Sequence, residues 1–447
     1  MNRQVLSKEL FIAVRQTRTT VQKKQHYLEI PQIVNRLAEQ IISRTYQPSQ
    51  YSCFAISDPT PREILAPSYP DRIVHRWLVN KMEPYIDKRF LDCSYSNRKG
   101  KGHHHAVKQL QFYLNNPANK YYLKSDIESF FNSIDHAVLL FLLERWISKL
   151  PYSEQERAMI ESVAKTIVTH NPTHNVVYNG NKEKLKIIPP SKSYFNNPPG
   201  RGLPLGNLSS QFFANIYLHE LDWFVKQQLH VRYYLRYVDD IIIMAESGEE
   251  LNFYCKKIAD FLEEKLKLQL HPNKTILQPT RYGIDFLGYI VRRDYLLVRK
   301  RVVKNFKRKL YFYNHLLAPD KYPFRRVVGL EVGQGNGKIE KLCRTHELTV
   351  PVKPNRSLLL SMQSSFNSYY GIFRFADTHH LRKELYLHRF GTLQKYFYAN
   401  NRFHKTGLLK KCLTNSSLSE ESQVGQVVHT GLPEWLVQAG LPKPNFF

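Results

Sequence analysis

The segment YYLRYVDDIIIMA, residues 233–245, constrains the fold of this chain more than any other stretch. Tyr, Val and Ile on both sides of the aspartate pair favour pleated, half-buried strands, whereas Asp is depleted from strands. Asp239 and Asp240 are therefore predicted to occupy the tight turn of a β-hairpin. Two adjacent carboxylates at the tip of an apolar hairpin repel each other unless a cation lies between them. A surface turn with two hydrated acids is the alternative interpretation.

A third aspartate, Asp126, ends another strand-like run in NKYYLKSDIESFFNSIDH (119–136), 113 residues before Asp239. If the two strands are neighbours, three carboxylates converge at one edge of a sheet. Their repulsion then has a use, because two Mg²⁺ ions about 3.5–4 Å apart need bridging oxygen ligands. Such a pair of ions serves phosphoryl transfer: one lowers the pKa of the attacking hydroxyl, and the other neutralises the triphosphate and the leaving pyrophosphate.

The composition favours a polyanionic partner. Lys and Arg number 65 against 38 Asp and Glu, a net charge of +27, and each basic side chain set against a phosphate releases counterions. With 42% hydrophobic residues the chain can bury a core, which excludes a disordered basic tail. Five scattered cysteines predict neither a zinc site nor disulfides and fit a reducing cytoplasm. No signal peptide or membrane span is expected.

Six motifs in a fixed order carry a resemblance to a known family. They are REILAPSYPDRIVHRWLVNKMEP (62–84), SYSNRKGKG (94–102), DIESFF (126–131), GLPLGNLSSQ (202–211), YVDD (237–240) and FLGY (286–289). In this order they resemble the motifs of prokaryotic reverse transcriptases, the group that includes group II intron, retron and diversity-generating enzymes. The resemblance covers roughly residues 50–310 and is looser beyond them.

The resemblance implies an α+β right-hand polymerase with fingers, a palm whose antiparallel sheet packs on helices, and an α-helical thumb. The expected parts are an N-terminal helical extension (1–50), fingers (51–120), a palm (121–290, with a fingers insertion at about 150–204), a thumb (291–400) and a C-terminal tail (401–447). The implied reaction is RNA-directed DNA synthesis from dNTPs, on an RNA template and a DNA or RNA primer.

The same resemblance implies the metal site. Asp126 and Asp239 are the expected principal ligands of two Mg²⁺ ions, with Asp240 as the third carboxylate and the backbone carbonyl of Ile127 as a further ligand. Lys274, in HPNKT, matches a lysine near the leaving pyrophosphate, where it would serve as a general acid. An exposed lysine without a role in the reaction is the alternative.

Four residues are the implied contacts of the incoming nucleotide. Arg62 matches a fingers arginine that grips the triphosphate, because a guanidinium suits phosphate oxygens. Thr60 stands near a place where relatives often carry lysine, so Arg72 is a second candidate. Phe131 matches the aromatic steric gate that excludes a ribose 2′-hydroxyl, with a core role as the alternative. Gln211 is expected near nucleotide and template.

Two basic segments are expected to follow nucleic-acid phosphates. The first is the glycine-containing loop before residue 103, and the second is the run 291–313, with nine Lys or Arg and one acid. The second would track the primer–template backbone without reading bases; a solvated helix face is the alternative. The residues singled out are Arg98, Lys99 and Lys101 in the first segment and Lys307, Arg308 and Lys309 in the second.

The biological role is open at this stage. The L-G-x-x-x-S-Q form of residues 205–211 resembles both diversity-generating retroelement enzymes and some defence-associated reverse transcriptases. The long segment 314–360 and the tail exceed what a compact diversity-generating enzyme needs, which favours antiphage defence with a locus-encoded non-coding RNA as template. A non-catalytic RNA-binding scaffold is the third alternative. An accessory protein or a second copy of the chain is a further candidate partner.

Two connecting segments are also predicted from the sequence. GQGNGK (333–338) is expected to be a loop, and NSSLSEESQ (415–423) is expected to be a linker.

Overall fold

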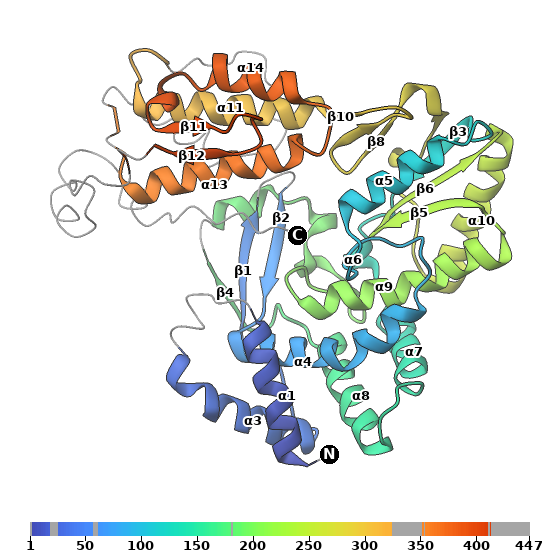
Figure 1. Ribbon diagram of the computed structural model, residues 1–447. Coiled ribbons are helices and arrows are strands. Elements are labelled where there is room, and N and C mark those ends of the chain that lie inside the picture. Colours follow the sequence, from blue (N-terminus) through green and yellow to red (C-terminus); the bar gives the residue numbers. More distant parts are fainter. Residues whose placement is uncertain are drawn as a thin grey trace. The chain divides into compact units, whose positions relative to one another are not determined.

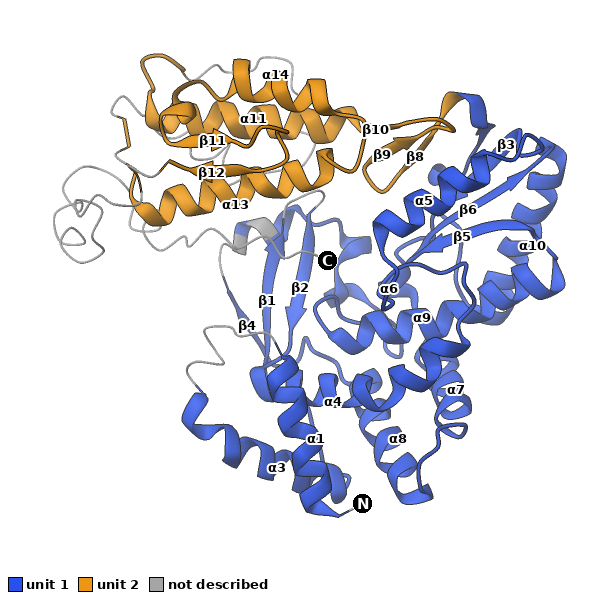
Figure 2. Ribbon diagram, viewed as in Figure 1, with its two compact units in different colours: residues 1–281, 332–337 blue, residues 282–331, 338–447 orange. Residues whose placement is uncertain are grey.

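The structure, a computed structural model, describes residues 2–17, 26–56, 61–179, 182–323, 351–352, 354–409 and 412 (Figure 1). The predicted loop 333–338 and linker 415–423 lie outside these residues, as does Thr60. The chain divides into two compact units, one comprising residues 1–281 and the other beginning at Tyr282 (Figure 2). Because only two units are separated, the finer expected division into extension, fingers, palm, thumb and tail stays a prediction.

The centre of the first unit is a four-stranded antiparallel sheet in the order β5-β6-β3-β7. Aromatic and β-branched residues dominate its strands, and β6 is buried along nearly its whole length. Helix α10 packs against β3 and β6, while α5 packs against β5. The strands are β3 (Tyr121–Ser125), β5 (Tyr233–Tyr237), β6 (Asp240–Ala245) and β7 (Ile276–Pro279).

The predicted hairpin is present, but its turn lies one residue earlier than expected. Tyr237 pairs with Asp240 across β5 and β6, so the two turn residues are Val238 and Asp239. Asp240 is the first residue of β6 rather than part of the turn. The prediction of two turn aspartates is therefore wrong for Asp240, because a two-residue hairpin loop leaves room for only one of them.

A second, three-stranded sheet in this unit has the order β2-β1-β4, with β2 antiparallel and β4 parallel to β1. Helix α4 follows β2 and begins where the Ser68 side chain accepts a hydrogen bond from the Asp71 N–H. Helices α1 and α3 pack against α4. The strands are β1 (Tyr51–Ile56), β2 (Arg62–Ala66) and β4 (Val176–Tyr178).

Nine helices of the described part of the first unit accompany the two sheets (Figure 1). Helix α9 lies among them and is buried on most of its surface, so it can present polar side chains to the interior. The helices are α1 (Arg3–Gln16), α3 (Ile30–Ile42), α4 (Tyr69–Ile86), α5 (His103–Leu114), α6 (Phe130–Ser133), α7 (His136–Ile147), α8 (Glu154–Thr169), α9 (Leu208–Trp223) and α10 (Gly248–Leu266).

In its described residues the second unit combines a small antiparallel sheet, three α-helices and a short hairpin. Its core is aromatic: the Phe306 ring lies 4.7 Å from Tyr369 and 5.5 Å from Phe373, centroid to centroid. The elements are β8 (Ile284–Phe286), β9 (Tyr289–Val291), β10 (Leu296–Val298), α11 (Lys300–Leu317), α13 (Arg356–Phe373), α14 (His379–Arg389), β11 (Phe397–Ala399) and β12 (Thr406–Leu408).

The predicted α+β class is confirmed, since both units combine helices with antiparallel strands. Within the described ranges no helix is both long and apolar enough to span a bilayer.

Candidate active site

The pairing of β3 with β6 brings the first aspartate to the other two. Ser125 lies opposite Ile241 in the antiparallel register. Asp126 follows Ser125 and Asp240 precedes Ile241, so both aspartates lie at the same end of the paired strands. Asp239 stands next to them in the turn. Residues more than a hundred positions apart in the sequence are thus gathered at one end of the central strands.

The electrostatics of the site reflect this proximity. Burial raises the pKa of Asp239 to about 7, and the charges of Asp126 and Asp240 act in the same direction. Burial also raises the pKa of Asp240, with a further increase from Asp126. Neighbouring carboxylates thus disfavour the ionised forms of Asp239 and Asp240, a pattern that is typical of functional sites.

Two lysines supply the opposing charge. Lys274, at the end of the short helix Pro272–Lys274, forms a hydrogen-bonded ion pair with Asp126. Lys124 Nζ lies 3.7 Å from Asp240 Oδ1, and both lysines lower the pKa of Asp240. The sequence prediction included Lys274 but missed Lys124. A lysine inside an otherwise apolar strand, two residues before Asp126, was the available signal.

The carboxylate oxygens of the three aspartates are the ligand type that a hard divalent cation prefers, although they do not enclose an ion on all sides. Within the described ranges no group of three or more His, Cys, Asp or Glu side chains is placed so that it could hold a metal ion by itself. Mg²⁺ is usually held by only one or two carboxylates together with substrate phosphates, so an incomplete protein ligand set fits this ion. The backbone after Asp126 is fixed by an antiparallel bridge between Ile127 and Leu270.

The turn itself is strained. Val238 has φ +56°, a conformation that β-branched residues rarely adopt. Left-handed backbone at a non-glycine residue is unfavourable by about 1–3 kcal/mol and persists only where the surrounding structure enforces it. The residue directly before Asp239 is therefore held in place by contacts outside the turn.

Arg62, a predicted contact of the incoming nucleotide, lies close enough to Asp239 to act on it electrostatically. It is the exposed first residue of β2, and its charge lowers the pKa of Asp239. The loop 202–207 supports this strand, since the Leu65 N–H donates to the Leu205 carbonyl at 2.9 Å. A Cβ on Gly206 would lie 2.6 Å from the Leu65 carbonyl oxygen, which explains glycine at this position.

Arg72 and Gln211 lie on helices near the same loop. Arg72 Nε donates to the Pro67 carbonyl at 3.0 Å, and the side chain is partly buried in the first turn of α4. Gln211 is partly exposed in the first turn of α9. Their proposed contacts with nucleotide or template stay predictions.

Phe131 is the more accessible of two adjacent phenylalanines. Phe130 is 2% exposed, whereas Phe131 is only partly buried against the core, with its ring 5.2 Å from that of Phe130. The Phe131 carbonyl accepts a hydrogen bond from the Leu203 N–H at 2.7 Å. The role of Phe131 as a steric gate stays a prediction.

The basic loop 94–102 requires a correction. The Arg98 side chain is 6% exposed and donates to the Asp87 carboxylate at 2.7 Å and to the Leu91 carbonyl at 2.6 Å. Lys101 Nζ contacts Asp92 Oδ1 at 3.0 Å and lies 4.7 Å from the Tyr95 ring centroid. Arg98 is therefore a structural residue rather than a phosphate contact, and Lys101 is engaged internally. Lys99 is exposed, and its role stays a prediction.

The basic residues of α11 belong to the second unit. Lys307 and Arg308 are exposed, whereas Lys309 Nζ lies 5.8 Å from the Tyr369 ring centroid. The opposite face of the helix is apolar, with Phe306 and Leu310 buried. This amphipathic pattern is compatible with phosphate binding and with a solvated face, so the prediction is neither confirmed nor contradicted.

Comparisons with known proteins identify relatives of this chain. Protein YkfC of Escherichia coli (strain K12) is 24% identical over 309 residues, which are 59% of this chain and 71% of YkfC. The group II intron-encoded protein LtrA of Lactococcus lactis subsp. cremoris is 23% identical over 329 residues, 60% of this chain and 50% of LtrA. The chain thus spans about half the length of LtrA.

Among solved structures, apo telomerase from Candida tropicalis, truncated from the C-terminal domain, aligns with a TM-score of 0.39 and 13% identity, covering 56% of this chain and 55% of that one. The family model described as reverse transcriptase (RNA-dependent DNA polymerase) matches residues 57–291, which is more than half of the chain. Together with the two sequence relatives, this match confirms the resemblance inferred from the six motifs. The chain belongs to the reverse transcriptase family, whose members work with divalent metal ions.

Proposed function

We propose that this protein is an RNA-directed DNA polymerase that copies an RNA template into cDNA by nucleotidyl transfer with two Mg²⁺ ions. The observation that carries the proposal is the convergence of Asp126, Asp239 and Asp240 at one edge of the central sheet. Their chain belongs to a family of RNA-dependent DNA polymerases. A scaffold that only bound RNA would gain nothing from three carboxylates that repel both one another and phosphate.

The chain's own residues have distinct roles in this proposal. Asp126 and Asp239 would hold the ions, with Asp240 beside them, and the ions would supply activation of the primer 3′-hydroxyl and neutralisation of the triphosphate. Lys274, which pairs with Asp126 in the structure, would donate a proton from its ammonium to the leaving pyrophosphate. Arg62 contacts the triphosphate. Phe131 excludes the 2′-hydroxyl of a ribonucleotide.

The proposed template is a non-coding RNA encoded beside the gene, and the proposed role is antiphage defence. This preference rests on the L-G-x-x-x-S-Q form of residues 205–211 and on the chain beyond the thumb helix α11. Mutagenic copying of a template repeat by a diversity-generating retroelement is the second candidate, since the same motif form favours it. An accessory protein or a second copy of the chain would complete the assembly.

The test is to express the gene with several hundred flanking bases and to sequence the DNA that accumulates, beside an Asp239→Ala, Asp240→Ala control. We expect DNA copied from a flanking RNA, only with both aspartates intact. A faithful or repetitive copy supports the defence role, whereas scattered changes at template adenines support diversification. DNA that is equally abundant in the double variant would contradict the polymerase proposal.

A further inference from the structure

A buried arginine in β5 lies close to the turn that carries Asp239. The Arg236 side chain is 1% exposed, and its partner Asp222 on α9 is 0% exposed. Nε and Nη2 of Arg236 each donate to one carboxylate oxygen of Asp222 at 2.7 Å, so the pair is bidentate. The Tyr234 hydroxyl donates to Asp222 Oδ1 at 2.7 Å. This pair is held in one geometry, because breaking it would leave a buried charge without water.

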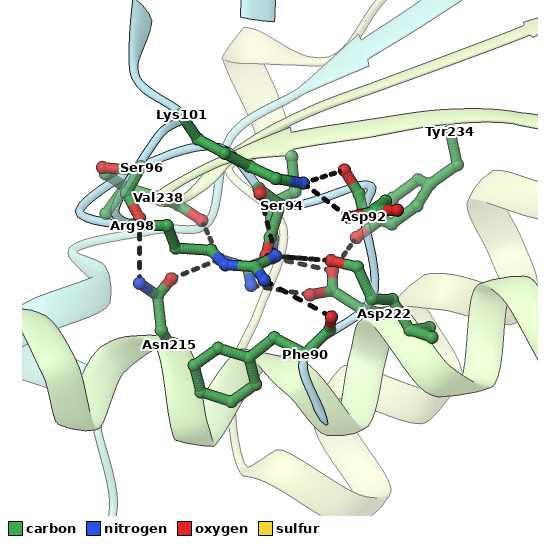
Figure 3. Close-up of polar contacts among 12 residues, drawn as sticks. Phe90, Asp92, Ser94, Ser96, Arg98, Lys101, Asn215, Asp222, Tyr234 and Val238 are labelled. Atoms are coloured by element: carbon green, nitrogen blue, oxygen red, sulfur yellow. Dashed lines mark hydrogen bonds and ion pairs between the residues drawn. The ribbon is translucent and has the colours of Figure 1, made fainter. Parts of the chain in front are cut away.

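The remaining terminal nitrogen of Arg236 reaches the turn. Nη1 donates to the Val238 carbonyl at 3.0 Å and to Oδ1 of Asn215 at 3.3 Å. One planar guanidinium therefore joins α9, through Asp222 and Asn215, to the residue before Asp239 (Figure 3). These contacts supply the outside restraint that the left-handed backbone of Val238 requires.

A further segment of the chain supports the same arginine from the edge of the sheet. The Arg236 N–H donates to the Cys93 carbonyl at 2.8 Å, and the Arg236 carbonyl accepts from the Tyr95 N–H at 3.0 Å. The side-chain amide of Asn215 donates to the Ser96 carbonyl at 2.9 Å. Arg98 in turn fixes this segment to Asp87. The position of the turn is thus determined jointly by α9 and by residues 93–98.

We propose that Arg236 is a positioning residue of the catalytic centre, which holds the Val238 carbonyl and so sets the direction of the Asp239 carboxylate toward Asp126. The inference rests on the proposed polymerase function. Arg236 touches neither metal nor substrate in this account and acts only through the turn. A misplacement of about 1 Å at a reacting centre lowers the rate roughly a hundredfold, so an indirect support of this kind has a large effect.

A lysine at this position separates a positioning role from a purely stabilising one. Its ammonium can still pair with Asp222, but it is a point charge and lacks the planar fork that reaches Val238 and Asn215 at the same time. Arg236→Lys therefore keeps the buried charge pair and removes the restraint on the turn.

Two kinds of measurement follow. In primer extension with the full-length protein, Arg236→Lys should lower kcat roughly tenfold to a hundredfold, with KM for dNTP kept within about twofold because the nucleotide contacts are untouched. In a thermal melt without substrate, the MgCl₂ concentration that gives half of the maximal rise in Tm should increase several-fold over the wild type.

Arg382→Lys is the matched control. Arg382 is 4% exposed in the second unit and donates to two backbone carbonyls, those of Arg402 at 3.0 Å and Phe403 at 2.8 Å. The Arg382→Lys variant should also lose buried hydrogen bonds and therefore have a lower Tm. Its kcat, and the MgCl₂ concentration that gives half of the maximal rise in Tm, should stay unchanged.

The proposal is overturned if Arg236→Lys, after correction for its folded fraction, matches Arg382→Lys in kcat and in the Mg²⁺ midpoint. If Arg236→Lys does not fold, Asn215→Ala is compared with Arg382→Lys by the same criterion. Asn215→Ala removes one acceptor of Arg236 Nη1 and the hydrogen bond to the Ser96 carbonyl, but it keeps the ion pair of Arg236 with Asp222. If the wild type extends no primer, the proposed function fails, and the Mg²⁺ titration of Tm alone then decides the role of Arg236.

Discussion

Replacing Asp239 with asparagine should stabilise the metal-free protein at alkaline pH. Burial, followed by the charges of Asp126 and Asp240, raises the pKa of Asp239 in the folded state to about 7 from the ordinary value of 3.8. The unfolded chain ionises Asp239 near the ordinary value, so between these two pH values it releases a proton that the folded state keeps. The stability contributed by the protonated carboxyl is therefore lost as the pH rises through the folded-state pKa.

The structure sets the magnitude. The pKa of Asp239 rises from 3.8 in the unfolded chain to about 7 in the folded protein. This difference corresponds to a loss of about 4 kcal/mol at most in the free energy of unfolding at alkaline pH. We expect about half of this, about 2 kcal/mol, because Asp239 is partly exposed and titrates together with its two neighbours. Asp239→Asn removes the ionisation, so it should raise the free energy of unfolding by about 2 kcal/mol at about pH 8 and leave it almost unchanged at about pH 4.

The assay is urea denaturation in EDTA at both pH values, with Asp260→Asn as the control because Asp260 is an exposed acid on α10. Adding Mg²⁺ at alkaline pH should stabilise the wild type more than Asp239→Asn, since the ion binds the intact carboxylates. The idea that the neighbouring acids repel Asp239 would be refuted if Asp239→Asn changed the free energy of unfolding equally at the two pH values. Destabilisation by Asp239→Asn at about pH 8 would refute it as well.

Three further predictions concern other parts of the chain. Phe131→Ala should increase ribonucleotide incorporation in primer extension; unchanged sugar selectivity would exclude Phe131 as the steric gate. Asp222→Ala should destabilise the first unit by about 3–5 kcal/mol, because a buried guanidinium loses its carboxylate, and a loss below about 1 kcal/mol in urea denaturation would show that the site admits water. Neutralising three basic residues of α11 should weaken primer–template binding and reduce its salt slope by about one unit per lost phosphate contact; an unchanged slope would mean a solvated face. These residues are Lys307, Arg308 and Lys309.

Local sequence patterns predicted the main elements of the site. The aromatic and β-branched runs around YVDD form the expected strands, and Asp126 lies at the end of a strand as expected. The prediction succeeded because strand patterns and turn residues act over a few positions. The turn was misplaced by one residue because Val238 adopts a left-handed conformation that its own propensity opposes. A contact with Arg236, outside the turn, compensates for it.

Pairs of charges were much harder to predict. Arg98 sits in a basic, glycine-containing loop that is typical of phosphate binding, yet its guanidinium is buried against Asp87. Lys124 was missed because its partner Asp240 lies on a neighbouring strand. The sequence does not show which acid a base will meet after folding, because the partner is chosen by sheet register and helix packing. A charged residue inside an apolar strand, such as Arg236, is nevertheless a signal that a buried partner exists.

The most direct test of the central claim is primer extension by the purified protein on an RNA template, with a DNA primer, dNTPs and MgCl₂. The account predicts DNA synthesis that is abolished by EDTA and by either Asp126→Asn or Asp239→Asn, while both variants keep the wild-type fold by circular dichroism. DNA synthesis that persists in both variants would contradict the assignment of these aspartates as the catalytic centre. No synthesis by the folded wild type on any primer–template would favour the RNA-binding scaffold instead.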